Sequence, residues 1–328
     1  MNLGGQLKKL LSAGITSASF KRFIADTYKS GIGYIHLDPQ PEDCLVRTRS
    51  SGQLSSVGNF SHTSIAPLIT FVKTASGLKA HRSRLPDESS FDIGDFQIRV
   101  FSLPVTNGEK LVLQITKVNE TAKSLSGLGF GKNDVKTIQK ALKAKNGLIL
   151  ALGEDSQRVI FGMLAQLDAR AVSISTIEHQ RVLDLPLANQ FIDETNYQET
   201  APSALKIAMR QGSDVIALSR LDTPKLASLA LDAGLSGKLI LASLPISDAF
   251  LVPDYMTYLG VPLFLLSSQL RLIVSKPKDA QESTNAIEID DRFRDIFIAG
   301  LQPSEMRELY ESSAKSATKG GGTRKSIV

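Results

Sequence analysis

The chain has 328 residues, of which 42% are hydrophobic and 22% are charged, and its formal net charge is +5 at pH 7. This length accommodates about two domains, each with its own core. The mild charge argues against a dedicated nucleic-acid-binding protein, and the single cysteine, Cys44, excludes an internal disulfide and a multi-cysteine zinc site.

The N-terminal stretch lacks the apolar core and cleavage site of a signal peptide, and no run of about 18 apolar residues predicts a transmembrane helix. We therefore expect a cytoplasmic protein, which partners can hold at the inner face of the cell membrane. The four histidines are scattered without metal-ligand spacing, so we expect no metal site.

Residues 1–118 are predicted to form an α+β domain. Apolar residues at helical spacing predict helices over 17–29 and Ser64–Ala75. Short runs typical of strands are Tyr34–Leu37, Cys44–Thr48, Phe96–Phe101 and Leu111–Ile115. We expect these strands to form a mostly antiparallel sheet.

Residues 119–312 alternate differently and predict an α/β domain. The buried-strand candidates are Leu148–Leu152, Val172–Ile177, Val215–Leu218 and Leu239–Ser243, separated by helices near 158–168, 202–211, 224–233 and 247–259. This alternation predicts a mainly parallel sheet covered on both faces, with ligands bound at the carboxyl ends of its strands.

The C-terminal part contains a polar linker over 276–285 and then two short helices, over 290–299 and 303–312. Residues 313–328 are small, polar and basic, and we expect a disordered tail.

Two stretches have the outline of a glycine-rich phosphate loop. The stretch Gly127–Lys132 follows no clear strand and precedes Asn133 and Asp134, so a turn followed by a helix cap is the better interpretation. The second stretch begins at Gly153, directly after a predicted buried strand, and leads into a helical pattern. That is the place at which a parallel sheet binds phosphate.

Several short motifs resemble, in order, those of the secretion ATPases that power type II secretion and type IV pilus assembly. They are "GYIHLDPQ" (33–40), "VRTRSSGQL" (46–54), "SRLPDESSF" (83–91), "RVFSLPVTNGEKLVLQI" (99–115), "LGVPLFLLSSQLRLIVS" (259–275) and "IDDRFRDIFIAGLQPSEMREL" (289–309). The last two resemble later helices of that family. The resemblance covers about residues 20–312 and implies a PAS-like N-terminal domain followed by a RecA-like P-loop NTPase domain.

The active-site motifs of that family are only partly present. Its phosphate loop reads Gly-x-x-x-x-Gly-Lys-Ser/Thr, and the corresponding residues here are Gly153, Glu154, Asp155, Ser156, Gln157, Arg158, Val159 and Ile160. Gly153 matches the first glycine. The second glycine, the lysine that meets the β/γ-phosphates and the hydroxyl that ligates Mg²⁺ are replaced by Arg158, Val159 and Ile160. Glu154 and Asp155 add negative charge to a loop that should hold an anion.

Three further boxes depart from the family pattern. In the acidic box Glu178 is retained, while His179 and Val182 replace acids. Arg220 stands at the position of the catalytic glutamate, in a segment that the family writes as Asp-Val-Ile-x-x-Gly-Glu-Ile-Arg-Asp. Pro245 replaces the histidine of the histidine box. A cation at residue 220 can neither activate water nor sit easily beside Mg²⁺.

In the first domain, Arg47, Arg49 and Arg84 match arginines that in relatives approach the nucleotide phosphates. Surface or interface salt bridges are an equally good interpretation of these three residues. Arg220 at the altered site is expected to pair with Glu154 or Asp155, because a buried unpaired arginine is costly.

The resemblance and the altered motifs together favour a pseudo-ATPase that serves in assembly. No metal and no cofactor are expected under this hypothesis. The resemblance implies a homo- or hetero-oligomeric ring with an active paralogous ATPase, and contact with an inner-membrane platform protein of a pilus or secretion machine.

Two alternatives stay open. One is an unconventional ATPase in which Arg158 and Arg220 hold phosphate without Mg²⁺ and Glu178 acts as base. The other is a regulator that binds ATP without hydrolysing it.

Overall fold

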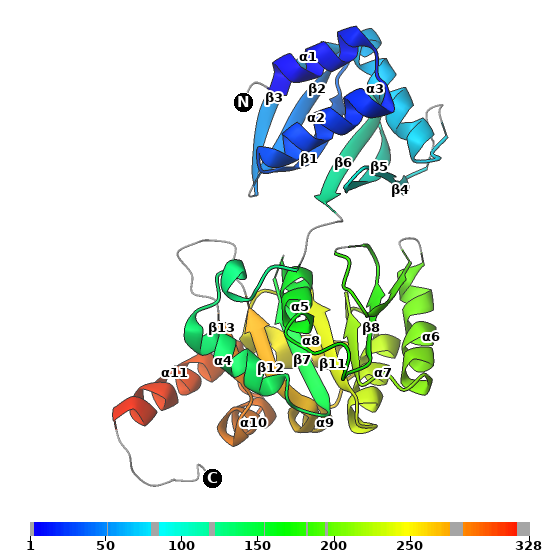
Figure 1. Cartoon of the computed structure of the whole chain (residues 1–328). Coiled ribbons are helices and arrows are strands. Elements are labelled where there is room, and N and C mark those ends of the chain that lie inside the picture. The colour runs from blue at the N-terminus through cyan, green and yellow to red at the C-terminus, as the bar shows by residue number, and fades with distance from the viewer. Residues whose placement is uncertain are drawn as a thin grey trace. The chain divides into compact units, whose positions relative to one another are not determined.

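The computed structural model describes residues 3–50, 52–79, 85–117, 122–153, 155–181, 183–193, 196–275 and 285–319. It divides into two compact units. The first consists of Met1–Glu120 with Arg181–Asp184, and the second of Thr121–Gln180 with Leu185–Val328. Figure 1 shows the elements of both units.

The first unit is a sheet with helices on one face. Its elements are α1 (Leu3–Ala13), α2 (Ser17–Lys29), β1 (Ile32–Pro39), β2 (Asp43–Ser50), β3 (Gln53–Ser61), α3 (His62–Ala75), β4 (Asp87–Ile93), β5 (Phe96–Val105) and β6 (Gly108–Lys117). The strands run antiparallel in the order β3-β2-β1-β6-β5-β4. The predicted α+β character and antiparallel sheet are both present.

The core of the first unit is formed by apolar residues that alternate along its strands and recur at helical spacing along its helices. In β1 the side chains of Ile35 and Leu37 alternate with polar ones and are buried. Helix α2 begins after Thr16, which forms a reciprocal capping box with Ser19, and it buries Phe20 among other apolar side chains. Helix α1 was not predicted from the sequence, although Leu3, Leu7 and Leu10 lie on its buried side.

The only cysteine lies in this core. Cys44 is 2% exposed, and burial, together with the nearby carboxylates of Asp38 and Asp43, raises the pKa of its thiol to about 11. The thiolate is the reactive form. We expect native protein at pH 8 to resist alkylation by iodoacetamide, and urea-unfolded protein to react completely. Mass spectrometry of both samples measures this, and rapid labelling of the native chain would contradict the burial.

The second unit is built around a larger sheet. Its elements are the 3₁₀ helix η1 (Ser126–Leu128), α4 (Lys132–Ala141), β7 (Gly147–Leu152), α5 (Ser156–Leu164), β8 (Ile174–Glu178), β9 (Asn189–Ile192), α6 (Tyr197–Arg210), β10 (Val215–Leu218), α7 (Pro224–Leu235), β11 (Leu239–Leu244), the 3₁₀ helix η2 (Ala249–Leu251), α8 (Val252–Tyr258), α9 (Leu263–Gln269), β12 (Leu270–Ser275), β13 (Asn285–Glu288), α10 (Asp291–Ile298) and α11 (Pro303–Lys319).

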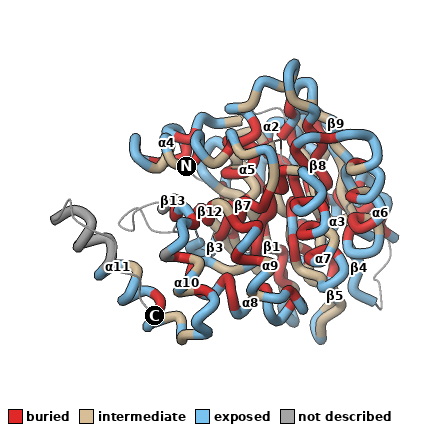
Figure 2. The backbone as a smooth tube through the Cα atoms, turned by 90° about the horizontal axis from the view of Figure 1, so that it is seen from below, coloured by how far each residue is buried: buried red, intermediate tan, exposed pale blue. Residues whose placement is uncertain are grey.

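The strand order of this sheet is β13-β12-β7-β11-β10-β8-β9. All neighbouring strands are parallel except β12 and β13. Every residue of β7, β8, β10 and β11 is buried, which requires cover on both faces of the sheet. Figure 2 shows β7 and β8 as continuous buried stretches. The predicted α/β architecture is confirmed.

The structure corrects several predicted boundaries. The stretch 259–275, which resembles a later helical part of the family, ends in strand β12. Helix α11 continues to Lys319, although a disordered tail was expected from residue 313. The helix after Gly127–Lys132 is not capped by Asn133 or Asp134, because Gly131 is its N-cap. Residues 276–284 of the predicted linker and residues 320–328 lie outside the described residues.

Among the described residues, no helix combines the length and the apolar character that crossing a membrane requires.

Candidate functional site

Four parallel strands place the altered motifs at one edge of the second unit. Strands β7, β11, β10 and β8 are consecutive neighbours in the sheet and run in the same direction. The residues that follow them, beginning with Gly153, Pro245, Ser219 and His179, therefore meet at the carboxyl edge of the sheet. This is the edge at which open α/β sheets bind their ligands.

The connection between β7 and α5 is short. Gly153 has a φ of +89°, which a glycine adopts readily, and its N–H donates to the carbonyl oxygen of Ile246 at 2.8 Å. Glu154 lies outside the described residues, and α5 then begins at Ser156 after the N-cap Asp155. Two of the four residues that a phosphate loop places between its glycines are thus part of a helix.

Two backbone N–H groups at the start of α5 donate to carbonyl oxygens within the chain. The N–H of Ser156 donates to the carbonyl oxygen of Gly153 at 3.2 Å, and that of Val159 donates to Asp155 at 3.0 Å. The Val159 bond is the ordinary one of a helix, whereas the Ser156 N–H is withdrawn from a loop whose N–H groups would otherwise face an anion. Val159 and Ile160, at the lysine and hydroxyl positions, are 1% and 2% exposed. Both side chains belong to the interior of the unit.

Gln157 crosses from α5 to the ends of two strands. Its side-chain amide Nε2 donates to the carbonyl oxygen of Ser219 at 3.1 Å and lies 3.4 Å from Nδ1 of His179. The backbone N–H of His179 donates to the Ser219 hydroxyl at 2.9 Å. The hydroxyl of Ser243, in β11, donates to the same Ser219 carbonyl. The protein's own side chains therefore join α5 to the edge formed by β8, β10 and β11.

Changing Gln157 to glutamate tests this connection. The variant replaces the donating amide by a carboxylate opposite the Ser219 carbonyl, and we expect the free energy of unfolding of the second unit to fall by about 1–3 kcal/mol. Gln166→Glu is the matched control, because Gln166 makes an exposed contact with Gln139 and should change little. Urea unfolding of both variants measures the difference, and equal effects would contradict a special role for Gln157.

Arg220 forms an ion pair that was not predicted. Its Nε lies 2.7 Å from Oδ2 of Asp222, whose side chain is 9% exposed against 48% for Arg220. The expected partners were Glu154, which lies outside the described residues, and Asp155. The sequence did contain the signal for Asp222, because the family motif has an arginine at that position. In the family motif these two positions hold a glutamate and an arginine, and in this chain they hold Arg220 and Asp222, so that the two charges have exchanged places.

Tyr197 holds the backbone at Arg220. Its hydroxyl donates to the Arg220 carbonyl oxygen at 2.8 Å and lies 3.3 Å from the Arg220 nitrogen. Burial strongly raises the pKa of the Tyr197 hydroxyl, so it stays protonated and can donate. Tyr197 therefore holds the backbone of Arg220, the residue that the motif comparison predicts at the catalytic-glutamate position.

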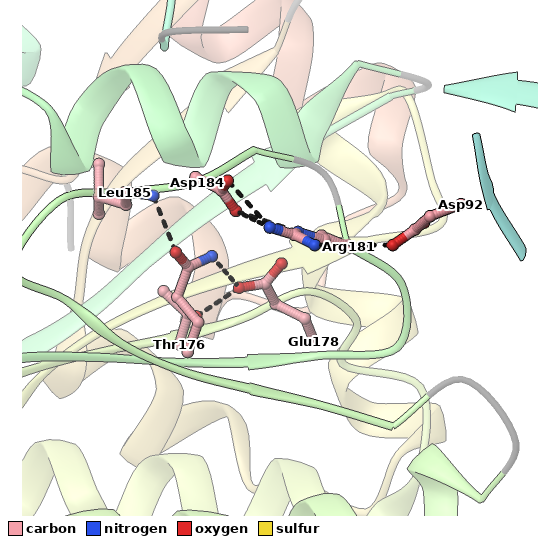
Figure 3. A network of polar contacts seen from close by, with 7 residues as sticks. Asp92, Thr176, Glu178, Arg181, Asp184 and Leu185 are labelled. Atoms are coloured by element: carbon pink, nitrogen blue, oxygen red, sulfur yellow. Dashed lines mark hydrogen bonds and ion pairs between the residues drawn. The ribbon is translucent and has the colours of Figure 1, made fainter. Parts of the chain in front are cut away.

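Glu178, the last residue of β8, is buried at the carboxyl edge of the sheet. Its side chain is 1% exposed, and its Oε1 accepts hydrogen bonds from the Thr176 hydroxyl and, at 2.9 Å, from Nε2 of Gln190. Gln190 in turn accepts from the backbone N–H of Leu185 at 2.8 Å. Figure 3 shows this network, which joins β8 to β9 and to the segment that leads into β9. Val182 lies outside the described residues.

Asp248, the acid that remains in the histidine-box segment after β11, makes two contacts. Oδ1 of Asp248 accepts from the N–H of Phe250 at 3.0 Å and so caps η2. Oδ2 of Asp248 forms an ion pair of 2.7 Å with Arg307 of α11. Pro245, at the histidine position, has no titratable group.

Of the three arginines predicted to approach phosphate, Arg47 and Arg49 have partners within the first unit. Nε of Arg47 lies 2.7 Å from Asp38, which also pairs with Lys110 at 3.0 Å. Burial raises the pKa of the Asp38 carboxyl, but the hydrogen bonds from Arg47 and Lys110 outweigh it and hold that pKa below its usual value. Arg49 donates to the carbonyl oxygen of Gly52 at 2.8 Å. Arg84 lies outside the described residues.

No group of three or more histidine, cysteine or acidic side chains within the described part of the chain is arranged to hold a metal ion.

Comparison with known proteins decides the family. The family model described as "Type II/IV secretion system protein" matches residues 10–285. The chain belongs to this family. The resemblance seen in the short motifs is therefore confirmed over most of the chain.

Curated relatives include type II secretion and type IV pilus proteins. The chain is 27% identical to the type II secretion system protein HxcR of Pseudomonas aeruginosa over 72% of this chain and 52% of that protein. It is 25% identical to the type IV pilus assembly ATPase PilB of Thermus thermophilus over 78% of this chain and 30% of that protein. The chain thus spans about half or less of these two relatives.

Solved structures of related ATPases share the fold. The Legionella pneumophila ATPase DotB superposes with a TM-score of 0.65 at 15% identity, covering 91% of this chain and 88% of that chain. The pilus retraction motor PilT with bound ADP gives a TM-score of 0.63 at 16% identity, covering 89% and 88%. At these identities the likeness concerns the fold, a RecA-like domain preceded by a smaller domain.

Proposed function

We propose that this chain is a non-hydrolysing subunit of a type II secretion or type IV pilus assembly machine. The observation that carries the proposal is the first turn of α5. Helix begins at Ser156, where a phosphate loop would still be open, and Gln157 bonds to Ser219 across the same edge of the sheet. The family framework is present, and Gln157 links α5 directly to a strand end at the edge where such sheets bind ligands.

The residues at the motif positions do not fit Mg²⁺ and a nucleoside triphosphate. The position of the metal-ligating hydroxyl is the buried Ile160, and the position of the catalytic acid is Arg220, a cation paired with Asp222. Phosphoryl transfer depends on a metal and positioned cations acting together. Glu178, the base under the alternative hypothesis, is buried and accepts two hydrogen bonds on one oxygen.

A subunit that does not hydrolyse ATP needs partners that do. We propose that the chain joins a ring with a catalytically competent member of its family, on the cytoplasmic side of a membrane, next to the platform protein of the machine. The support is the family membership, the retained two-unit framework and the altered site.

The rate of Mg-ATP hydrolysis tests the proposal. We expect the full chain alone to release phosphate no faster than buffer, and to co-elute with an active relative encoded by the same organism when the two are mixed. Turnover by the chain alone that disappears in the Arg158→Ala variant would overturn the proposal and favour an unconventional ATPase. Failure to associate with any active relative would overturn the assembly role.

A further inference from the structure

The first half of the C-terminal helix α11 (Pro303–Lys319) packs against the second unit. Met306 is 1% exposed, and the half-buried Tyr310 packs with its ring centroid 5.2 Å from that of Phe293 and 5.9 Å from that of Phe250. The neighbouring side chains Glu308, Leu309 and Glu311 are exposed. Met306 and Tyr310 therefore attach the described first half of α11 to the second unit.

Arg307 joins this anchor to the edge of the sheet. Its guanidinium forms the 2.7 Å ion pair with Asp248 and lies 5.0 Å from the centre of the Phe250 ring. Asp248 is also the N-cap of η2, so the same carboxylate holds α11 and fixes the start of the segment that follows β11.

The segment held by Arg307 in turn holds the loop after β7. Ile246, two residues before Asp248, accepts the 2.8 Å hydrogen bond from the N–H of Gly153. Pro245 precedes it and restricts the backbone of this short segment. Arg307 is thus linked to Gly153 by the ion pair to Asp248, by the chain from Asp248 back to Ile246, and by the hydrogen bond from Gly153.

We propose that α11 is a conformational latch on the altered phosphate loop. With the Arg307–Asp248 pair formed, the segment 245–248 is in the position that accepts the Gly153 N–H and restrains the start of the loop. Displacement of α11 by a partner breaks the pair, frees this segment and loosens the loop and the start of α5. The latch couples the C-terminal end of the described chain to the edge that carries the altered motifs.

Hydrogen exchange of the full chain, followed by mass spectrometry, tests the latch. In Arg307→Ala we expect exchange to rise about threefold in peptides covering Gly153–Ser156 and 245–250, because a half-exposed ion pair contributes modestly. Asp248→Asn, which keeps an oxygen able to cap η2, should produce the same increase near Gly153. Glu308→Ala, one residue from Arg307 and exposed, should change neither peptide.

An increase confined to α11 in both Arg307→Ala and Asp248→Asn would overturn the latch and leave the ion pair a local contact. The same holds if Glu308→Ala loosens the loop as much as Arg307→Ala does. ATP is absent from these measurements, so their outcome is independent of whether the chain hydrolyses nucleotide.

Discussion

Replacing Lys73 by methionine is expected to lower the free energy of unfolding of the first unit by about 3–5 kcal/mol, because the change leaves a buried carboxylate without its cation. The Lys73 side chain is 2% exposed, and its ammonium lies 2.8 Å from Oε2 and 2.9 Å from Oε1 of Glu109, which is 10% exposed. The Ser102 hydroxyl donates to the same carboxylate. This pair joins α3 to β6 at the edge of the core.

Two further variants separate the charge from the packing. The double variant Lys73→Met/Glu109→Leu should recover most of the lost stability, because neither charge is then buried alone. Lys140→Met is the matched control on an exposed pair, since Lys140 and Glu288 are 70% and 44% exposed, and should cost less than about 1 kcal/mol. Urea unfolding followed by pulsed hydrogen exchange reports each unit separately, so that Lys73 is read in the first unit and Lys140 in the second. Equal losses at Lys73 and Lys140 would contradict the account.

Gly147→Ala is expected to destabilise the second unit by about 3 kcal/mol or more, through backbone strain and overpacking at the start of β7. Gly147 has a φ of +114°, and an added Cβ would lie 2.6 Å from the backbone oxygen of Gln269 and 2.7 Å from Nε of Arg271. The backbone oxygen cannot move aside without displacing the chain that leads into β12.

A second glycine gives the control for this prediction. Gly212 also has a positive φ, +82°, but a Cβ added there would have no other atom within 4 Å. Gly212→Ala should therefore show only the conformational strain, about 1 kcal/mol. Urea midpoints of the two variants, read from peptides of the second unit, measure the difference. A loss at Gly147 no larger than that at Gly212 would show that the close approach to Gln269 is relieved by small shifts.

The sequence predicted the elements whose signal is local. Buried strands β7, β10 and β11 are short apolar runs between helical patterns, and their parallel arrangement follows from that alternation. Helix α1 and strand β12 were missed or assigned to the wrong type, because short apolar runs at a chain end or after a helix do not separate helix from strand.

The altered site shows the limit of sequence reasoning more clearly. Motif comparison predicted that Val159 and Ile160 cannot replace a lysine and a hydroxyl, since this depends on chemistry alone. The bridge from Gln157 to Ser219 joins residues 62 positions apart, and no local pattern announces it. The partner of Arg220 was readable, because an arginine of the family motif has become Asp222, but only a pairwise comparison of both positions reveals the exchange of charge.

Calorimetric titration of the full chain with Mg-ATP tests the central claim most directly. Because Gln157 links α5 to the strand ends, we expect no saturable binding, with any Kd weaker than about 1 mM. The titration is run at two temperatures, so that a binding enthalpy near zero at one of them cannot conceal association. Saturable binding with a Kd in the micromolar range would contradict the claim. It would mean that the first turn of α5 and Gln157 give way to the nucleotide.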